Sequence, residues 1–166
     1  MPADRSRSGG GELPPEILAL PAEDPASRAL LEAYAAELRV RMLAGYDPTR
    51  AAPPDPADFD PPAGVFLVAF LGRDPVGCAA LRTIGEEVGE IRRMYVAPRA
   101  RGRGVGRRLL GSVEAAARER GHRLVRLDTS EELHEAHALY ESCGYLRIDP
   151  YNENEFAARW YEKSLE

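Results

Sequence analysis

Cysteine is scarce in this chain of 166 residues, and long apolar runs are missing. The two cysteines, Cys78 and Cys143, are too few for a disulfide framework or for a metal site made of cysteine alone, so we expect them to fill space in the core. The longest wholly apolar run, residues 65–71, is far shorter than the ~20 residues that a membrane-spanning helix needs. Residues 1–10 lack the apolar stretch of a secretory signal. These absences predict no membrane contact and make the cytoplasm the expected location.

Lysine is almost absent, because arginine supplies all but one of the 22 basic residues. The formal net charge of −5 argues against a general polyanion binder, so we expect no nucleic-acid partner. The segment 91–113 nevertheless contains no acidic residue and seven arginines, which are Arg92, Arg93, Arg99, Arg101, Arg103, Arg107 and Arg108. One short basic segment in an acidic protein suits a small anionic ligand held at one place better than a nucleic-acid track.

The order of the predicted elements indicates one α/β (α+β) domain over residues 13–166, preceded by a disordered tail, residues 1–12. Six prolines in residues 47–62 exclude a regular helix or a central strand there, and predict a long loop. Strands are predicted over residues 17–20, 65–71, 76–82, 88–96, 124–128, 145–148 and 159–163. Helices are predicted over about 26–44, 105–120 and 130–142, the last opened by a capping box of Thr129 and Glu132. This order predicts a mixed sheet with helices around it.

The predicted strand 88–96 carries a carboxylate, although strands disfavour glutamate. The rough alternation along the strand places Val88, Glu90, Arg92 and Met94 on one face. Glu90 is therefore a candidate functional residue, and its structural alternative is a strand carboxylate paired with an arginine such as Arg82.

A glycine- and arginine-rich segment joins this strand to the next predicted helix. Its glycines, Gly102, Gly104 and Gly106, let the backbone approach a ligand, and the free N–H groups of a helix N-terminus bind anions. Arginines nearby offer bidentate donors to phosphate. A Walker loop is excluded because Gly106 is followed by arginine, and the Gly-x-Gly-x-Gly spacing after antiparallel strands excludes a dinucleotide fingerprint. The segment predicts a phosphate site, and its structural alternative is a flexible basic turn.

The segment Arg101-x-x-Gly104-x-Gly106 resembles the Arg/Gln-x-x-Gly-x-Gly/Ala signature of the GNAT superfamily of acetyl-CoA-dependent N-acetyltransferases. Residues 90–96 look like the central strand of that family, and residues 136–145 look like its later helix with the ending Leu-Tyr-x-x-x-Gly-Phe/Tyr. Residues 76–82 look like its Val-Gly-x-x-x-Leu-Arg strand, and the resemblance runs over about 65–165. It implies a central sheet, mixed and mostly antiparallel, with splayed strands that form a cleft for CoA.

The resemblance also implies where acetyl-CoA binds as co-substrate. The strand 88–96 would part from the strand 124–128 near a bulge at 94–96, so that the pantetheine arm pairs with the free backbone. The pyrophosphate would bind the N–H groups of residues 102–107. The implied set is Met94, Tyr95, Val96, Arg101, Gly102, Arg103, Gly104, Val105, Gly106 and Arg107. No metal is implied, and the three histidines make no recognisable metal set.

The implied reaction is direct attack of a primary amine on the acetyl thioester in a ternary complex. Glu90 would take the proton of the amine through water, and Tyr140 would protonate the leaving thiolate. A core tyrosine is the structural alternative for Tyr140. Many relatives carry an asparagine at the start of the later helix, where this chain has residues 131–135, and His134 is either its substitute or a surface histidine.

The sequence says less about the acetyl acceptor than about the acetyl donor. We expect a small-molecule amine, while a peptide N-terminus and a protein lysine stay open, as does a homodimer. By analogy with the family, the acceptor site would be lined by Tyr34, Arg41, Tyr46, Tyr151 and Asn152. Two other functions compete: a non-catalytic CoA-binding sensor, and an RNA-binding module that uses the arginine–glycine segment.

Overall fold

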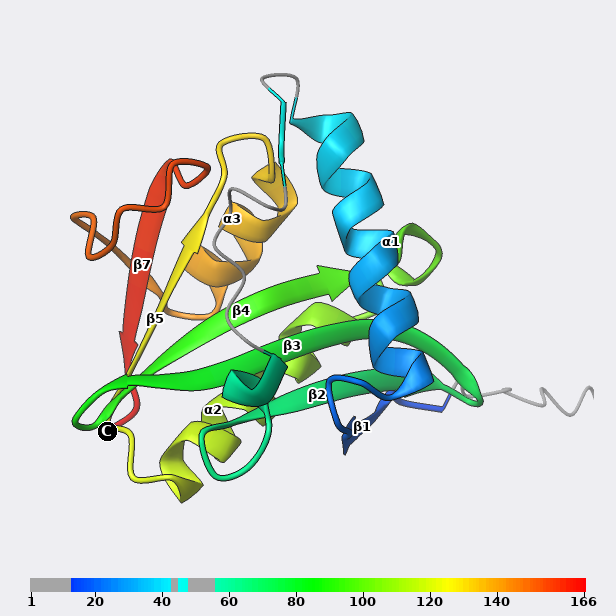
Figure 1. Ribbon diagram of the computed structural model, residues 1–166, viewed down its shortest axis with the longest axis horizontal. Coiled ribbons are helices and arrows are strands. Elements are labelled where there is room, and N and C mark those ends of the chain that lie inside the picture. Colours follow the sequence, from blue (N-terminus) through cyan, green and yellow to red (C-terminus); the bar gives the residue numbers. More distant parts are fainter. Residues whose placement is uncertain (1–12, 43–44, 48–55) are drawn as a thin grey trace, which may run out of the picture.

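The computed structural model describes residues 13–42, 45–47 and 56–166. They form a seven-stranded sheet in the order β1-β2-β3-β4-β5-β7-β6, with helices on both faces (Figure 1). The strands are β1 (Glu16–Ala19), β2 (Gly64–Leu71), β3 (Asp74–Gly85), β4 (Val88–Val96), β5 (Leu124–Thr129), β6 (Leu146–Ile148) and β7 (Arg159–Ser164). The helices are α1 (Pro25–Arg41), α2 (Val105–Glu119) and α3 (His134–Ser142), with 3-10 turns η1 (Pro56–Phe59) and η2 (Pro98–Ala100). The predicted α+β fold with a mixed, mostly antiparallel sheet is confirmed.

Some of the predicted organisation falls outside the described residues. The tail, residues 1–12, lies there, and so do residues 48–55 of the proline-rich segment. The described end of that segment forms η1 and leads into β2. None of the described helices combines the length and the apolar character that crossing a membrane requires.

The two faces of the sheet carry separate apolar clusters. Leu109 and Val113 of α2 are buried against one face together with Ile91 of β4, so the predicted apolar stripe of this helix is its packed face. Leu30 of α1 is buried against the opposite face with Phe66 of β2. Burial of one such side chain contributes about 1.5–3 kcal/mol, which fixes both helices on the sheet.

The strands β4 and β5 meet at one end of the sheet and then diverge, as Figure 1 shows. They are the only parallel neighbours in the described sheet, and they pair only over residues 88–90 and 124–126. Beyond Glu90, β4 pairs with β3 alone, and β5 continues with β7. The implied parting of these strands is confirmed, and it leaves one backbone edge of β4 without a partner strand.

A bulge in β4 changes which side chains share a face. Arg93 and Met94 together oppose the single residue Ala79 of β3, and Arg93 adopts a φ of 54°. The extra residue reverses the alternation, so Met94 packs with the cluster under α2 while Tyr95 joins the cluster under α1. The expectation that Met94 shares a face with Glu90 is therefore wrong. The bulge begins at Arg93, just before the expected position.

Two helix boundaries differ from the sequence-based expectation. The helix α1 ends at Arg41 rather than near residue 44. The helix α3 begins at His134, and no side chain caps it. The predicted capping box is wrong because Thr129 is still the last residue of β5, paired with Arg159 of β7.

Candidate active site

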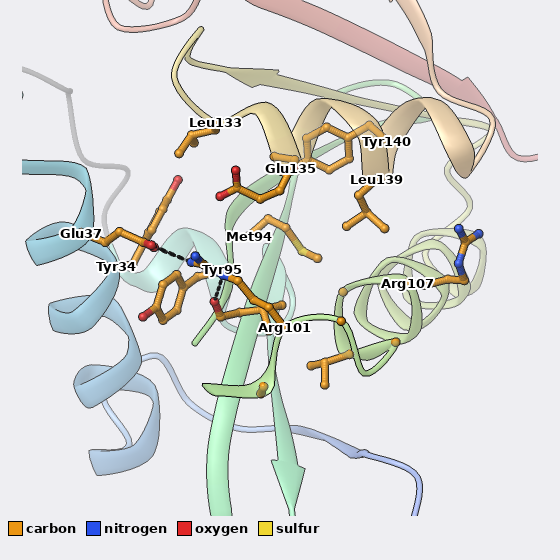
Figure 2. Close-up of a pocket in the computed structure, with 17 residues that line it drawn as sticks. Tyr34, Glu37, Met94, Tyr95, Arg101, Arg107, Leu133, Glu135, Leu139 and Tyr140 are labelled. Carbon is orange, nitrogen blue, oxygen red and sulfur yellow. Dashed lines mark hydrogen bonds and ion pairs between the residues drawn. The ribbon is translucent and has the colours of Figure 1, made fainter. Parts of the chain in front are cut away.

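A cavity of about 290 Å³ lies where the end of β4, the glycine loop and the start of α2 face α3, with α1 at its side (Figure 2). Its wall holds nearly the whole predicted CoA-binding set, namely Met94, Tyr95, Val96, Arg101, Gly102, Gly104, Val105, Gly106 and Arg107. Arg103 is the one member of the set that is not on this wall. The wall also includes Leu139 and Tyr140 of α3. Tyr140 is the residue expected to protonate the thiolate. We call this the first cavity.

The glycine loop delivers the start of α2 to the first cavity. Gly102 and Gly104 adopt φ values of 76° and 79°, which a residue with a side chain rarely adopts. Gly104 is the N-cap of α2, and no side chain caps the first turn, so its N–H groups are available to an anion. Gly106 makes a different contribution: a Cβ atom there would stand 2.9 Å from Cδ2 of Leu139. Because glycine has no Cβ atom, α2 can approach α3 closely at this position.

The arginines of the loop are already engaged by protein groups. The Arg101 guanidinium donates from Nη2 to both carboxylate oxygens of Glu37, each at 2.7 Å, and from Nε to the carbonyl of Val96 at 3.0 Å (Figure 2). Arg101 thus ties the loop to α1, and its Nε and Nη2 groups are already used by protein acceptors. Arg107 donates to the Ser142 hydroxyl at 2.9 Å, on the exposed rim. The groups of this loop that stay available to an anion are therefore mainly the backbone N–H groups.

A second, smaller cavity of about 80 Å³ adjoins the first. Tyr34, Met94, Leu133, Ala136 and Tyr140 belong to the walls of both. The other walls of the second cavity come from α1, the bulge of β4, the end of β5 and the loop before β7; they are Leu38, Met42, Tyr46, Ile91, Arg92, Arg93, Asp128, Thr129, Ser130, Asn154 and Phe156. Two cavities that share a wall can hold two reactants against each other.

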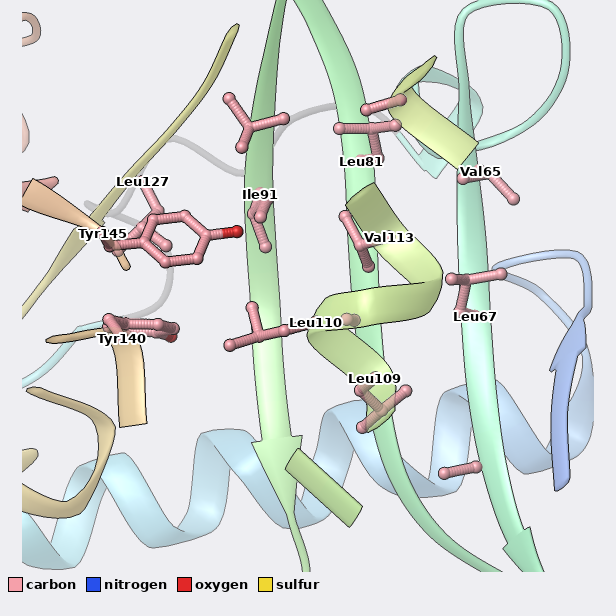
Figure 3. Packing of buried hydrophobic residues seen from close by; sticks show 14 of the residues in the cluster. Val65, Leu67, Leu81, Ile91, Leu109, Leu110, Val113, Leu127, Tyr140 and Tyr145 are labelled. Atoms are coloured by element: carbon pink, nitrogen blue, oxygen red, sulfur yellow. The ribbon is translucent and has the colours of Figure 1, made fainter. Parts of the chain in front are cut away.

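Tyr140 stands where the two cavities meet. Its side chain is 4% exposed, and its ring packs against that of Tyr145, with centroids 5.8 Å apart (Figure 3). The ring of Tyr161 lies on it too, at a centroid distance of 5.9 Å. Burial raises the pKa of the Tyr140 phenol well above its ordinary value. Within the described part of the chain, no protein group forms a hydrogen bond with its hydroxyl. Tyr140 is both a core tyrosine and a protonated donor at a cavity wall.

Glu90 is placed differently. It is 2% exposed and belongs to the wall of neither cavity. Nε of Arg82 donates to one carboxylate oxygen at 2.9 Å, and the Tyr151 hydroxyl donates to the other at 2.9 Å. Arg92, which does line the second cavity, lies 3.8 Å from Glu90. The arginine pairing offered as the structural alternative is present, and the role of base stays a prediction.

Sequence reasoning missed Asp128, which does line the second cavity. Its carboxylate accepts hydrogen bonds from Arg92 at 3.3 Å, from Asn152 at 2.6 Å and from Asn154 at 2.9 Å. The signal in the sequence was a carboxylate at the end of a buried strand that neighbours the central one. Three protein donors thus already bond to this carboxylate.

The expected acceptor-lining residues separate into two groups. Tyr34 and Tyr46 line the second cavity as expected. Tyr151 and Asn152 stand behind the wall, where they bond to Glu90 and Asp128. Arg41 instead ties α1 to α3, because it pairs with Glu135 and donates to the Glu132 carbonyl at 2.7 Å.

His134 lines neither cavity and packs edge-on against His137, with ring centroids 5.8 Å apart. It therefore contacts α3 itself rather than the first cavity. Among the described residues, no group of three histidine, cysteine or acidic side chains is arranged to hold a metal ion.

The chain is similar in sequence to known acetyltransferases. Residues 28–145 match the acetyltransferase (GNAT) family. An IAA acetyltransferase of Azospirillum brasilense is 39% identical over 87 residues, which are 52% of this chain and 57% of that protein. An aminoglycoside N(6')-acetyltransferase type 1 of Stenotrophomonas maltophilia is 35% identical over 94 residues, which are 52% of this chain and 61% of that protein. The chain thus spans less than two thirds of the length of these curated relatives.

Solved structures are similar over nearly the whole chain. An acetyltransferase of the GNAT family from Staphylococcus aureus Mu50 superposes with a TM-score of 0.77 at 18% identity, over 92% of this chain and 100% of that one. A Klebsiella pneumoniae protein assigned to the acyl-CoA N-acyltransferases superposes with a TM-score of 0.72 at 28% identity, over 92% of this chain and 98% of that one. At 18% identity, the likeness to the Staphylococcus aureus structure concerns the fold alone.

Proposed function

The chain belongs to the acetyltransferase (GNAT) family, and from this membership we propose that it transfers the acetyl group of acetyl-CoA to a primary amine of a small molecule. The observation that carries the proposal is the first cavity, in which the open edge of β4, the uncapped start of α2 and Tyr140 share one wall. These are the three parts that a CoA thioester requires: a partner for its amides, a site for its pyrophosphate and a proton donor near its sulfur.

Acetyl-CoA would bind mainly through backbone groups. The pyrophosphate would accept hydrogen bonds from the N–H groups at the start of α2, which the loop glycines leave accessible. The pantetheine arm would add to the edge of β4 that β5 leaves unpaired beyond Glu90. The arginines of the loop would act indirectly, since Arg101 fixes the loop to Glu37 of α1.

The amine would attack from the second cavity. As the bond between nitrogen and the acetyl carbon forms, the bond between that carbon and sulfur breaks. The nitrogen loses a proton, for which Glu90 acting through water is the proposed base, and the thiolate receives the proton of the Tyr140 hydroxyl. Positioning of the two reactants supplies much of the rate, because no covalent enzyme intermediate is needed.

A small-molecule acceptor agrees with two observations. The second cavity is small, at about 80 Å³, and polar groups line much of it. The relative from Stenotrophomonas maltophilia is named for aminoglycosides, which are small molecules carrying amines. RNA binding finds less support, because Arg99 and Arg101 of the arginine–glycine segment are paired with Asp74 and Glu37.

We predict that acetyl-CoA and CoA stabilise the protein in a thermal-shift measurement, whereas ATP and NAD do not. At a concentration of about 100 times the dissociation constant, binding adds about 2.7 kcal/mol. For a chain of this size that amounts to a rise of roughly 5–10 °C in Tm. A Tm that does not respond to acetyl-CoA contradicts the proposed function.

Release of free thiol from acetyl-CoA, followed over a panel of amines, then separates catalysis from mere binding. An amine-dependent release supports transfer. Stabilisation by acetyl-CoA without release for any amine supports the CoA-binding sensor instead.

A further inference from the structure

Arg93 is a guanidinium on the wall of the second cavity that lacks an acidic partner among the described residues. The neighbouring arginines are paired: Arg92 lies 3.3 Å from Asp128, and Arg101 lies 2.7 Å from Glu37. Arg93 is only partly exposed, yet within the described part of the chain its side chain has neither an ion pair nor a hydrogen bond. A charge withdrawn from water without a partner is unfavourable, so its retention calls for an explanation.

The charges of the second cavity do not balance. Its described wall contains three charged side chains, Arg92, Arg93 and Asp128. Asp128 is already held by Arg92 and by two asparagine amides, so Arg93 leaves a net positive charge. Burial, and next the charge of Arg92, lower the pKa of Arg93, but a guanidinium in a protein keeps its charge. The unbalanced charge therefore persists under ordinary conditions.

The bulge in β4 is what turns Arg93 toward this cavity. In a regular strand, successive side chains point to opposite faces, so Arg92 and Arg93 would not share a cavity. In this bulged strand both line the second cavity, and Arg93 holds a φ of 54°. Such a left-handed conformation costs a residue with a side chain about 1–3 kcal/mol and is typically retained at functional sites.

Two hydroxyls of the same wall also lack partners. Thr129 and Ser130 are buried, and neither Oγ1 of Thr129 nor Oγ of Ser130 has a hydrogen-bond partner within the described residues. Tyr34 and Tyr46 of the same wall lie near enough to Arg93 to interact with its charge. The wall thus sets the Arg93 cation among hydroxyl-bearing residues, and Arg93 is the group that would bind an oxyanion.

We propose that the acceptor is an amine that also carries a carboxylate, and that Arg93 binds this carboxylate while the amine faces the thioester. This rests on the proposed function. A guanidinium can hold a carboxylate through two parallel hydrogen bonds, which would fix the orientation of the acceptor. A cavity of about 80 Å³ has room for roughly five water-sized groups, comparable with the amino, Cα and carboxylate atoms of an amino acid.

The first test compares matched acceptors with acetyl-CoA. Each set contains an α-amino acid, its carboxamide and the amine that remains after decarboxylation, so that only the acid group changes. We expect kcat/KM for thiol release to be at least about tenfold higher for the amino acid, the ratio that one charge-assisted hydrogen bond provides. Equal or faster release with the uncharged partners overturns the proposal, and so does failure of every acid-bearing amine.

The second test removes the cation. Arg93→Gln should lower kcat/KM for acid-bearing amines roughly tenfold to a hundredfold, mainly through KM, and should lower kcat/KM for acid-free amines much less. Arg93→Lys keeps the charge without the planar fork and should recover part of the loss, which also covers the case in which Arg93→Gln folds poorly. The matched control is Arg147→Gln, which removes an exposed arginine on β6 away from both cavities. Equal losses for both kinds of amine overturn the proposal.

Different results contradict the proposed function and the proposal of an acid-bearing acceptor. If acetyl-CoA does not stabilise the protein, the proposed function is contradicted. If acetyl-CoA stabilises it and acid-free amines are acetylated at the same rate as acid-bearing ones, only the proposal of an acid-bearing acceptor is contradicted.

Discussion

At the scale of single residues, Tyr140 combines a buried ring with a hydroxyl at the junction of two cavities. The ring belongs to the core beside Tyr145, as Figure 3 shows, and it also packs with Tyr161, so its position is fixed by apolar contacts. The hydroxyl has a raised pKa because burial disfavours the phenolate, so it is protonated at any neutral pH. A structural role and a proposed acid role are thus carried by different atoms of one side chain, which makes them separable.

We predict that Tyr140→Phe lowers kcat for acetyl transfer about a hundredfold, because the thiolate loses its proton donor while the ring still packs. The dissociation constant of acetyl-CoA should change little. Steady-state thiol release and thermal shift measure the two quantities. The matched control is Tyr145→Phe, which removes a hydroxyl that donates to Glu114 at 3.1 Å away from the cavities. It should cost about 1 kcal/mol of stability and leave kcat unchanged.

Glu90→Gln completes this residue-scale test. The substitution keeps the shape of the side chain but weakens its pairing with Arg82, so stability must be measured beside kcat. A fall in kcat of folded protein supports the proposed base. If only stability falls, Glu90 is structural, and if Tyr140→Phe and Glu90→Gln both leave transfer unchanged, the catalytic assignments are wrong.

At the scale of elements, the loop before α2 and the parted strands together form the proposed acetyl-CoA site. The loop brings an uncapped helix start to the first cavity, and the divergence of β5 frees the edge of β4 beside it. Arg101 joins the loop to α1 through Glu37, which lies 64 positions away in the sequence. The proposed anion site therefore depends on backbone geometry, which glycines control, rather than on the charge of any one arginine.

We predict that Gly104→Ala and Gly106→Ala each weaken acetyl-CoA binding roughly tenfold, equivalent to about 1.4 kcal/mol. Gly104 has a φ of 79°, which strains alanine, and a Cβ at Gly106 would press on Leu139 at the cavity wall. The matched control is Gly111→Ala within α2, where no heavy atom lies within 4 Å of the added Cβ. It should stabilise the protein by about 0.5–1 kcal/mol without changing affinity.

Titration calorimetry with acetyl-CoA measures the affinities of these three glycine variants and of Arg103→Ala. Arg103 is not on the cavity wall, so its substitution should matter less than either loop glycine. Affinities that fall only with the loss of Arg103 would contradict a site built from backbone N–H groups.

At the scale of the whole molecule, the two cores bury groups that ionise at alkaline pH. Burial raises the pKa of Cys78 to about 12 and the pKa of Tyr34 to about 12. Burial is also the main cause that raises the pKa values of Tyr140, Tyr145 and Tyr151. The unfolded chain releases these protons near the ordinary values, whereas the folded chain retains them. The folded state therefore binds more protons than the unfolded state in this range.

We predict that the free energy of unfolding decreases as the pH rises above about 9, first through Cys78 and then, above about 10, through the tyrosines. Each fully buried group contributes a loss of about 1.4 kcal/mol per pH unit until the pH reaches its folded pKa. Urea unfolding measured at intervals from about pH 8 upward tests this. Cys78→Ala should remove the decrease that begins near pH 9, and parallel curves for the two proteins would contradict burial of this thiol as its cause.

The sequence predicted the elements well because their signals are local. The apolar stripe of α2, the wholly apolar β2 and the glycine spacing of the loop each lie within a few consecutive residues. Together with the resemblance to the GNAT family, they predicted the fold and nine of the residues that line the first cavity. The capping box at Thr129 failed because pairing with β7 extended β5 through that residue, which no local pattern encodes.

The tertiary structure decided which charged and polar groups of the site pair with one another. Glu90 lines neither cavity, and its carboxylate accepts a hydrogen bond from Tyr151 of the loop before β7, a contact that no local pattern predicts. That Arg101 has a carboxylate partner and Arg93 has none among the described residues depends on where α1 and the end of β5 come to lie. Local patterns set periodicity and turns, whereas the pairing and burial of charges arise between residues distant in sequence, so only the folded chain shows which groups stay available to a substrate.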